Sequence, residues 1–105
     1  MNFINLTPHD IVVHKHESTV TYKPSGMVAR VSTKTSDFVD MIAVQTYGVI
    51  EGLPEPKPET LYIVSGLVAS ATQRQDVVAP ATSSPLTIRN DKGHVVSVPG
   101  FVRNA

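Results

Sequence analysis

Polar residues that could bind an anion stand out at two places in the chain. Ser65 and Gly66 follow the apolar run of residues 61–64 and precede apolar residues at helical spacing. Backbone N–H groups at the start of a helix attract phosphate or carboxylate, and a glycine permits close approach. Arg30 interrupts an apolar strand, where its guanidinium can reach solvent, pair with a carboxylate or bind an anion. We therefore expect an anion site at the start of this helix, with Arg30 or Arg74 beside it.

Each of these residues also has a purely structural explanation. Ser65 can simply cap the helix, and Arg74 can pair with Asp76 across a short turn. The turn is not a P-loop, because the Gly-Lys-Ser/Thr ending is missing. His9 and Asp10 do not form a dyad by spacing alone, because neighbours on a strand face opposite ways, and their segment can be a stabilised turn. The residues expected to bind a ligand are His9, Arg30, Ser65, Gly66, Arg74 and Asp76.

Two histidines raise the question of a metal. His14 and His16 are two apart at an expected strand, which would place them on one face where they could chelate an ion. Only His9 and His94 could add a further imidazole, and a solvated strand face is the alternative. No metal or cofactor is expected. Catalysis has no sequence signature either, because the chain lacks Gly-x-Ser-x-Gly, His-Glu-x-x-His and paired-carboxylate motifs.

Composition limits the function further. The 105 residues include nine Lys plus Arg and nine Asp plus Glu, so the cationic excess that duplex nucleic acid requires is missing. The chain has no cysteine, which excludes disulfides, thiol nucleophiles and zinc ribbons. The first residues show no signal-peptide features, and the apolar stretch of residues 61–69 is far shorter than the roughly 20 residues that span a bilayer. We expect a soluble, cytoplasmic protein without membrane or duplex nucleic-acid partners.

Short β-branched runs between turn residues predict a chain made mostly of strands. A proline at every second position of residues 52–59 predicts an extended connector. One short helix is expected at about residues 66–73, with a polar loop at residues 32–40. The expected strands are residues 11–15, 19–23, 27–32, 41–50, 61–64 and 76–79, and a hairpin of residues 86–89 and 94–98 turning at residues 90–93.

These elements predict the fold class. We expect an α+β, mostly β, single small domain over residues 1–105, built on an antiparallel or mixed sheet or a partly closed barrel with one helix packed on it. Short strands leave unpaired edges, and pairing those edges between copies is a common solution. A homo-oligomer is therefore expected.

Short motifs spread over nearly the whole chain carry a family resemblance. They are Asn5-Leu6-Thr7-Pro8-His9, Pro24-Ser25-Gly26, Ala29-Arg30, Gly52-Leu53-Pro54, Leu61-Tyr62-Ile63-Val64-Ser65, Arg74, Asp76, Pro80, Asp91 and Gly93. On these motifs the chain resembles a family of small accessory proteins encoded by bacteriophages and prophage-bearing bacteria, to which no activity is attached. The resemblance implies a phage setting, in the cytoplasm of an infected bacterial host, and an anti-defence role aimed at host systems.

Four functions fit these observations. The first is a binding protein that sequesters a small anionic, nucleotide-derived immune signal of the host, with phosphate at Ser65 and Gly66 and with His9 or Tyr62 against a base or ribose. Such a pocket would lie between copies in a homo-oligomer, because 105 residues leave little room for a large cavity. The others are an inhibitor that binds a host or defence protein directly, a phosphodiesterase-type enzyme using His9 as base, and a minor virion component.

Overall fold

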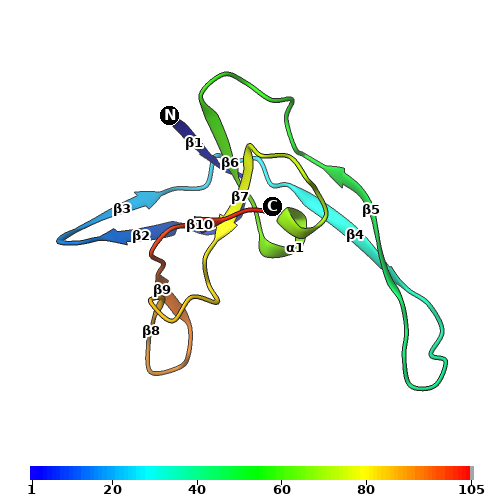
Figure 1. The fold of residues 1–105 in the computed structure, drawn as a ribbon. Coiled ribbons are helices and arrows are strands. Elements are labelled where there is room, and N and C mark those ends of the chain that lie inside the picture. The colour runs from blue at the N-terminus through cyan, green and yellow to red at the C-terminus, as the bar shows by residue number, and fades with distance from the viewer. Residues whose placement is uncertain (105) are drawn as a thin grey trace.

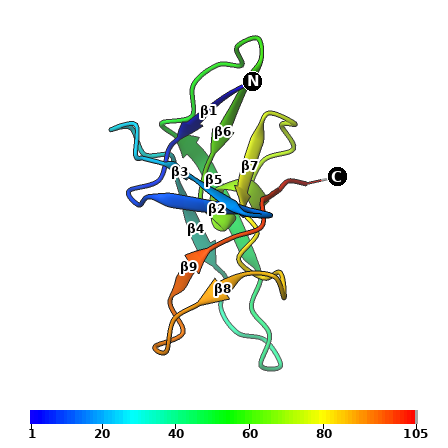
Figure 2. The ribbon, with the colours of Figure 1, turned by 90° about the vertical axis from the view of Figure 1, so that its left-hand side faces the viewer.

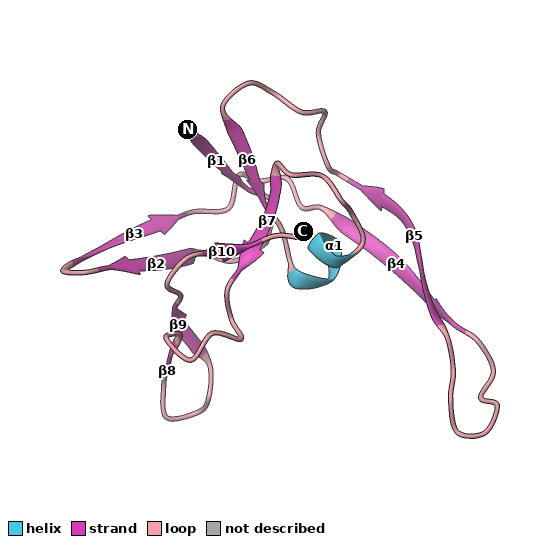
Figure 3. Ribbon diagram, viewed as in Figure 1, coloured by secondary structure: helices cyan, strands magenta, loops and turns pink. Residues whose placement is uncertain are grey.

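The computed structural model describes residues 1–104 and confirms an α+β fold that is mostly β (Figure 1). Most strands are short, and a single helix of five residues lies between the sixth and seventh strands. Figure 3 shows how much of the chain between them is loop. The elements are β1 (Asn2–Asn5), β2 (Ile11–Lys15), β3 (Ser18–Tyr22), β4 (Arg30–Thr35), β5 (Gln45–Glu51), β6 (Thr60–Ile63), α1 (Gly66–Ser70), β7 (Val77–Pro80), β8 (Ile88–Arg89), β9 (Val95–Ser97) and β10 (Phe101–Val102).

A four-stranded sheet in the order β1-β6-β7-β10 forms the centre of the molecule. β1 and β7 both run parallel to β6, and β10 runs antiparallel to β7. The apolar run expected as a strand at residues 61–64 is therefore central, as β6. A strand covered on both faces needs apolar residues at successive positions, which is why Tyr62 and Ile63 are both fully buried.

The two faces of the sheet are covered differently. One face packs against α1 through a cluster of small and branched side chains around Tyr62. The other carries three aromatic rings, Phe3, Tyr22 and Phe101, whose centroids lie 5.0–5.9 Å apart. Aromatic pairs at this spacing stabilise a fold beyond the area they bury. The helix-side core consists of Leu6, Ala29, Tyr62, Val64, Val68, Ala69, Val77 and Ala79.

Three hairpins, β2–β3, β4–β5 and β8–β9, project from this centre as separate two-stranded sheets. Figures 1 and 2 show the β4–β5 hairpin leaving on the side opposite β2–β3 and β8–β9. The strands do not close into a barrel within residues 1–104, and of the expected arrangements the structure shows the mixed sheet. The Cα radius of gyration is 15.3 Å, against about 13 Å for a compact chain of this length.

The β4–β5 hairpin begins and ends later than the sequence predicted. The expected strand of residues 27–32 is β4, Arg30–Thr35, and much of the expected loop of residues 32–40 is therefore strand. Ala29 is instead part of the core, and its N–H donates to the carbonyl of Leu6 at 3.0 Å. The expected strand of residues 41–50 is β5, Gln45–Glu51, because its first residues form the hairpin end.

Helix α1 starts at Gly66 as expected but ends at Ser70, before the predicted end at residue 73. The N–H of Ala71 bonds to the carbonyl of Val68, which tightens the last turn. The Asn104 side chain then donates to the carbonyls of Ala69 and Thr72, at 2.8 and 2.6 Å. These bonds satisfy the end of the helix from a distant part of the chain. None of the described residues belongs to a helix of the length and apolar character that crossing a membrane requires.

Candidate functional site

A cleft of about 230 Å³ lies where the loop after β1, the start of β4 and the start of α1 meet. Arg30 and Ser65, two of the expected ligand-binding residues, both line it. The sequence predicted an arginine beside this helix start, and Arg30 is that arginine. Its remaining walls are Leu6, Thr7, Pro8, Val28, Ala29, Val31, Leu67 and Val68.

Ser65 caps the helix. Its backbone is extended, and its side-chain oxygen accepts a hydrogen bond from the Val68 N–H at 3.3 Å. The capping explanation of Ser65 therefore holds, whether or not a ligand also uses the cleft. Gly66 lines a different hollow, of about 340 Å³, between α1 and the C-terminal segment.

Arg30 is the first residue of β4 and lies opposite Glu51 of β5 in the strand register. Its side chain is exposed, and it forms no ion pair within residues 1–104. It also borders a second hollow of about 230 Å³, shared with Val49 and Glu51. Arg30 therefore places a guanidinium between two clefts, and the planar fork of a guanidinium matches the geometry of phosphate and carboxylate.

The loop that forms one wall of the cleft is held by Asn5, which is almost completely buried. Its Nδ2 donates to the carbonyls of His9 and Tyr22, both at 2.8 Å. Its Oδ1 accepts from the backbone N–H and the hydroxyl of Thr7, at 2.9 and 2.7 Å. Ser25 closes the network by donating from its hydroxyl to the carbonyl of Asn5. The stabilised turn considered for the segment before β2 is present, since the Thr7 hydroxyl also bonds to the backbone of His9. The role of the Asn5 side chain was not predicted, because it depends on Tyr22, which is distant in the sequence.

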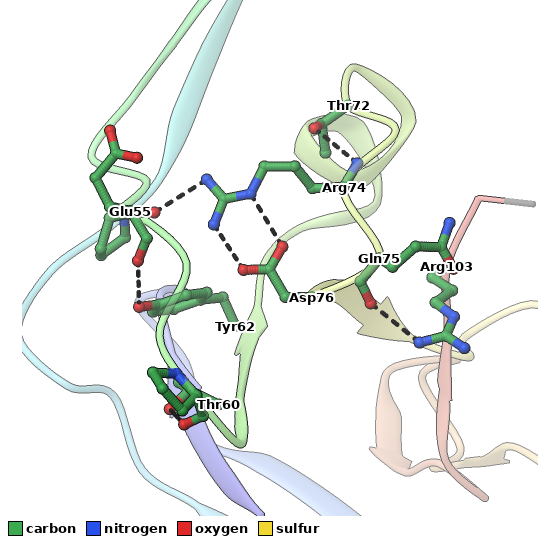
Figure 4. A network of polar contacts seen from close by, with 10 residues as sticks. Glu55, Thr60, Tyr62, Thr72, Arg74, Gln75, Asp76 and Arg103 are labelled. Carbon is green, nitrogen blue, oxygen red and sulfur yellow. Dashed lines mark hydrogen bonds and ion pairs between the residues drawn. The ribbon is translucent and has the colours of Figure 1, made fainter.

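Arg74 and Asp76 lie away from the cleft and bind each other (Figure 4). The guanidinium forms two bonds to the carboxylate, Nε to Oδ1 at 2.9 Å and Nη2 to Oδ2 at 2.7 Å. Nη1 donates to the carbonyl of Pro54 at 3.0 Å, and the guanidinium lies 5.9 Å from the Tyr62 ring centroid. The Tyr62 hydroxyl donates to the carbonyl of Glu55. This network fastens the proline-rich connector to the sheet.

The pair shifts both titrations in the directions that an ion pair produces. The hydrogen bond from Arg74 lowers the pKa of the Asp76 carboxyl, and the attraction between the charges lowers it further against the opposing effect of burial. The same hydrogen bond raises the pKa of Arg74. Nε, Nη1 and Nη2 of Arg74 are all hydrogen-bonded within the protein, so this side chain has a structural role.

His9 borders a hollow of about 700 Å³, which is larger than the three hollows described above. We call it the β2–β9 hollow, because it lies between the start of β2 and the β8–β9 hairpin. Asp10, Arg89 and His94 also line it, together with a larger number of apolar residues. The apolar lining consists of Ile11, Val12, Pro80, Val95, Val96 and Val98.

Of the two histidines considered for a metal, His14 lies within β2 and His16 lies after the strand has ended. His14 lies in β2 with its Nδ1 2.8 Å from the Ser97 hydroxyl oxygen. His16 lies in the following turn with φ at 28°, so the two do not share one strand face. In the part of the chain that the structure describes, no three His, Cys, Asp or Glu residues come together as a metal site.

Comparison of the chain with protein-family models, with curated proteins and with solved structures gives no match. The site must therefore be interpreted from its own geometry. Of six expected residues, the structure brings Arg30 and Ser65 together. Gly66 borders the hollow beside α1, His9 borders the β2–β9 hollow, and Arg74 pairs with Asp76.

Proposed function

We propose that this is an accessory binding protein that sequesters a small anionic, nucleotide-derived ligand. The observation that carries the proposal is the cleft in which Arg30, without an ion-pair partner among residues 1–104, meets the Ser65 turn. A guanidinium beside a polar turn can form charge-assisted bonds to phosphate. The family motifs supply the setting, in which the ligand is an immune signal made by an infected bacterium.

The size of the cleft limits what one copy can bind alone. Its volume of about 230 Å³ is below the roughly 300–1,000 Å³ typical of sites for drug-sized molecules. A phosphate group fits such a volume, and a complete nucleotide does not. In this proposal the rest of the ligand extends over the rim, where a second copy completes the site.

The direct test is to identify small molecules released by denaturing the full chain after purification from infected or signal-producing cells. Mass spectrometry should find a nucleotide on the parent chain. Titration calorimetry with cyclic dinucleotides, cyclic trinucleotides, AMP and inorganic phosphate then ranks the candidates. Arg30→Ala should weaken binding of the best probe by about 10- to 100-fold, the equivalent of losing hydrogen bonds to a charged group.

Lys34→Ala is the matched control, because it removes a cation from the same strand outside the cleft. It should bind the probe as the parent does. If Arg30→Ala and Lys34→Ala weaken binding of the probe equally, the effect comes from the net charge of the protein and not from the cleft. The proposal is wrong if the parent chain carries no small molecule and binds none of the probes.

A direct inhibitor of a host protein is the second candidate, because the end of the β4–β5 hairpin exposes apolar side chains. Phe38 is 73% exposed and Met41 is 92% exposed. Exposed apolar groups gathered at one place are typical of protein-binding surfaces. The discriminating experiment is cross-linking in infected cells, with recovery of a host protein on the parent chain and its loss on Phe38→Ser.

A further inference from the structure

The end of the β4–β5 hairpin, residues 36–44, is the most exposed apolar segment of the described chain. We call it the arm tip. Its backbone is ordered: Val39 and Ile42 exchange two hydrogen bonds, at 2.8 and 3.0 Å, and Ser36 bonds to Val44. Five of its nine residues are large apolar side chains at least 63% exposed, namely Phe38, Val39, Met41, Ile42 and Val44.

The total exposed surface of the chain is larger than that of a compact monomer of the same mass. The chain exposes 7377 Å², whereas a compact monomer of 11.3 kDa exposes about 5,700 Å². The excess is roughly 1,700 Å², about twice the roughly 800 Å² that each partner contributes to a standard interface. A protomer that presents one surface to one neighbour and a different surface to another would cover this excess.

The β2–β9 hollow is the surface that fits the arm tip. It is the largest of the hollows described above, and Val95 and Val96 in its wall are 40% and 50% exposed. The charges also correspond. Asp37 and Asp40 lie on the tip, whereas Arg89 and two histidines line the hollow. Its one carboxylate, Asp10, lies 3.9 Å from the ammonium group of Lys23.

We infer that the arm tip of one copy docks into the β2–β9 hollow of a second copy of this chain. The arm and the hollow lie on opposite sides of the molecule, which is 50 Å long, so the arm does not reach its own hollow (Figures 1 and 2). Contacts between two different surfaces join copies head to tail, and they produce a ring or an open filament. The inference stands on the arm and the hollow alone and does not depend on the ligand proposed above.

The test uses two variants of the full chain. Phe38→Ser combined with Met41→Gly removes the largest tip side chains, and glycine suits the φ of 68° at residue 41, so the hairpin is retained. Val96→Glu places a charge in the hollow. Light scattering should show an assembly larger than 11.3 kDa for the parent and a monomer for each variant. Val102→Ser, which removes an apolar side chain 54% exposed on β10, is the control and should assemble as the parent does.

Mixing the two variants makes the test specific for head-to-tail docking. The tip variant keeps an intact hollow and the hollow variant keeps an intact arm, so an equimolar mixture should form a dimer of one copy of each. A mixture that stays monomeric overturns the docking between tip and hollow. The docking is also overturned if the parent chain is monomeric up to high micromolar concentration, or if the tip variant still assembles. The arm tip is then better explained as a surface that binds a host protein. Circular dichroism establishes that each variant is folded.

Discussion

The side chain of Arg74 joins two parts of the chain, because it bonds to Asp76 next to β7 and to Pro54 in the connector. Arg74→Lys keeps the charge but loses the two-point geometry that only a guanidinium provides. We expect the free energy of unfolding to fall by about 1.5–3 kcal/mol, the range for hydrogen bonds to charged groups. Urea denaturation measures the change. Arg103→Lys is the control, since that exposed guanidinium bonds to one carbonyl, and it should unfold as the parent does.

The same pair predicts how stability depends on pH. The pKa of Asp76 is lowered in the folded state, so its ionic contribution is complete above the ordinary value of 3.8 and is lost as pH falls through the lower folded value. Asp76→Asn should therefore destabilise the protein most near neutral pH, and the difference from the parent should shrink in acid. Urea denaturation at a series of pH values checks this. A difference that is constant from neutral pH down into strong acid would show that the charge of Asp76 contributes nothing.

Asn5 makes a third prediction at this scale. Asn5→Asp replaces the Nδ2 donor with an acceptor facing the carbonyls of His9 and Tyr22, while it keeps the acceptor for Thr7. An unsatisfied buried group costs about 1–3 kcal/mol, more when it is charged, so the variant should be destabilised at least to this extent. Thr7→Ser keeps the hydroxyl and should cost much less. Thermal unfolding of the two variants separates these expectations.

At the scale of elements, the β4–β5 arm depends on a bulge. Between two regular pairs, β4 has Ser32 where β5 has both Gly48 and Val49. A Cβ added at Gly48 would collide with the Ser32 hydroxyl. Gly48→Ala should therefore push the Ser32 hydroxyl out of its rotamer and loosen the arm, at a cost of about 0.5–1.5 kcal/mol, and Ser32→Ala in the same chain should restore it. Hydrogen exchange of the β4 and β5 amides is the measurement. Equal exchange in the single and double variants would mean that the hydroxyl is not the obstacle.

The elements that the sequence predicted well are those with a local signal. The turn residues and β-branched runs are sufficient for β2, for the β8–β9 hairpin and for β6, and Ser65 marks the start of α1. β1 and β10 were not predicted, because each is a strand only through its partner, β6 or β7. The end of α1 depends on Asn104, more than 30 residues away. Such long-range bonds leave no local pattern.

The candidate site follows the same rule. The sequence indicated Arg30 and Ser65 from their local surroundings, and the fold brings them together. It could not tell Arg30 from Arg74, since both are single arginines near strands and only the fold places Asp76 and Pro54 around the second. The arm tip was also missed. Its apolar residues have the composition of a strand, and their exposure results from the hairpin that carries them away from the core.

At the scale of the whole molecule, the balance of buried and exposed side chains predicts that stability depends on association. Twelve hydrophobic residues are buried and sixteen large ones are exposed among residues 1–104, which is a small core for three projecting hairpins. An assembly that binds only folded protomers stabilises them by mass action, by up to about 1.4 kcal/mol for each tenfold rise in concentration. Since 1 kcal/mol shifts the Tm of a domain of this size by about 4–8 °C, the Tm should rise by several degrees for each tenfold rise. Calorimetry across the micromolar range measures this, and the variant with Phe38→Ser and Met41→Gly should show a constant, lower Tm. A parent chain whose Tm does not change with concentration would mean that the core alone sets its stability.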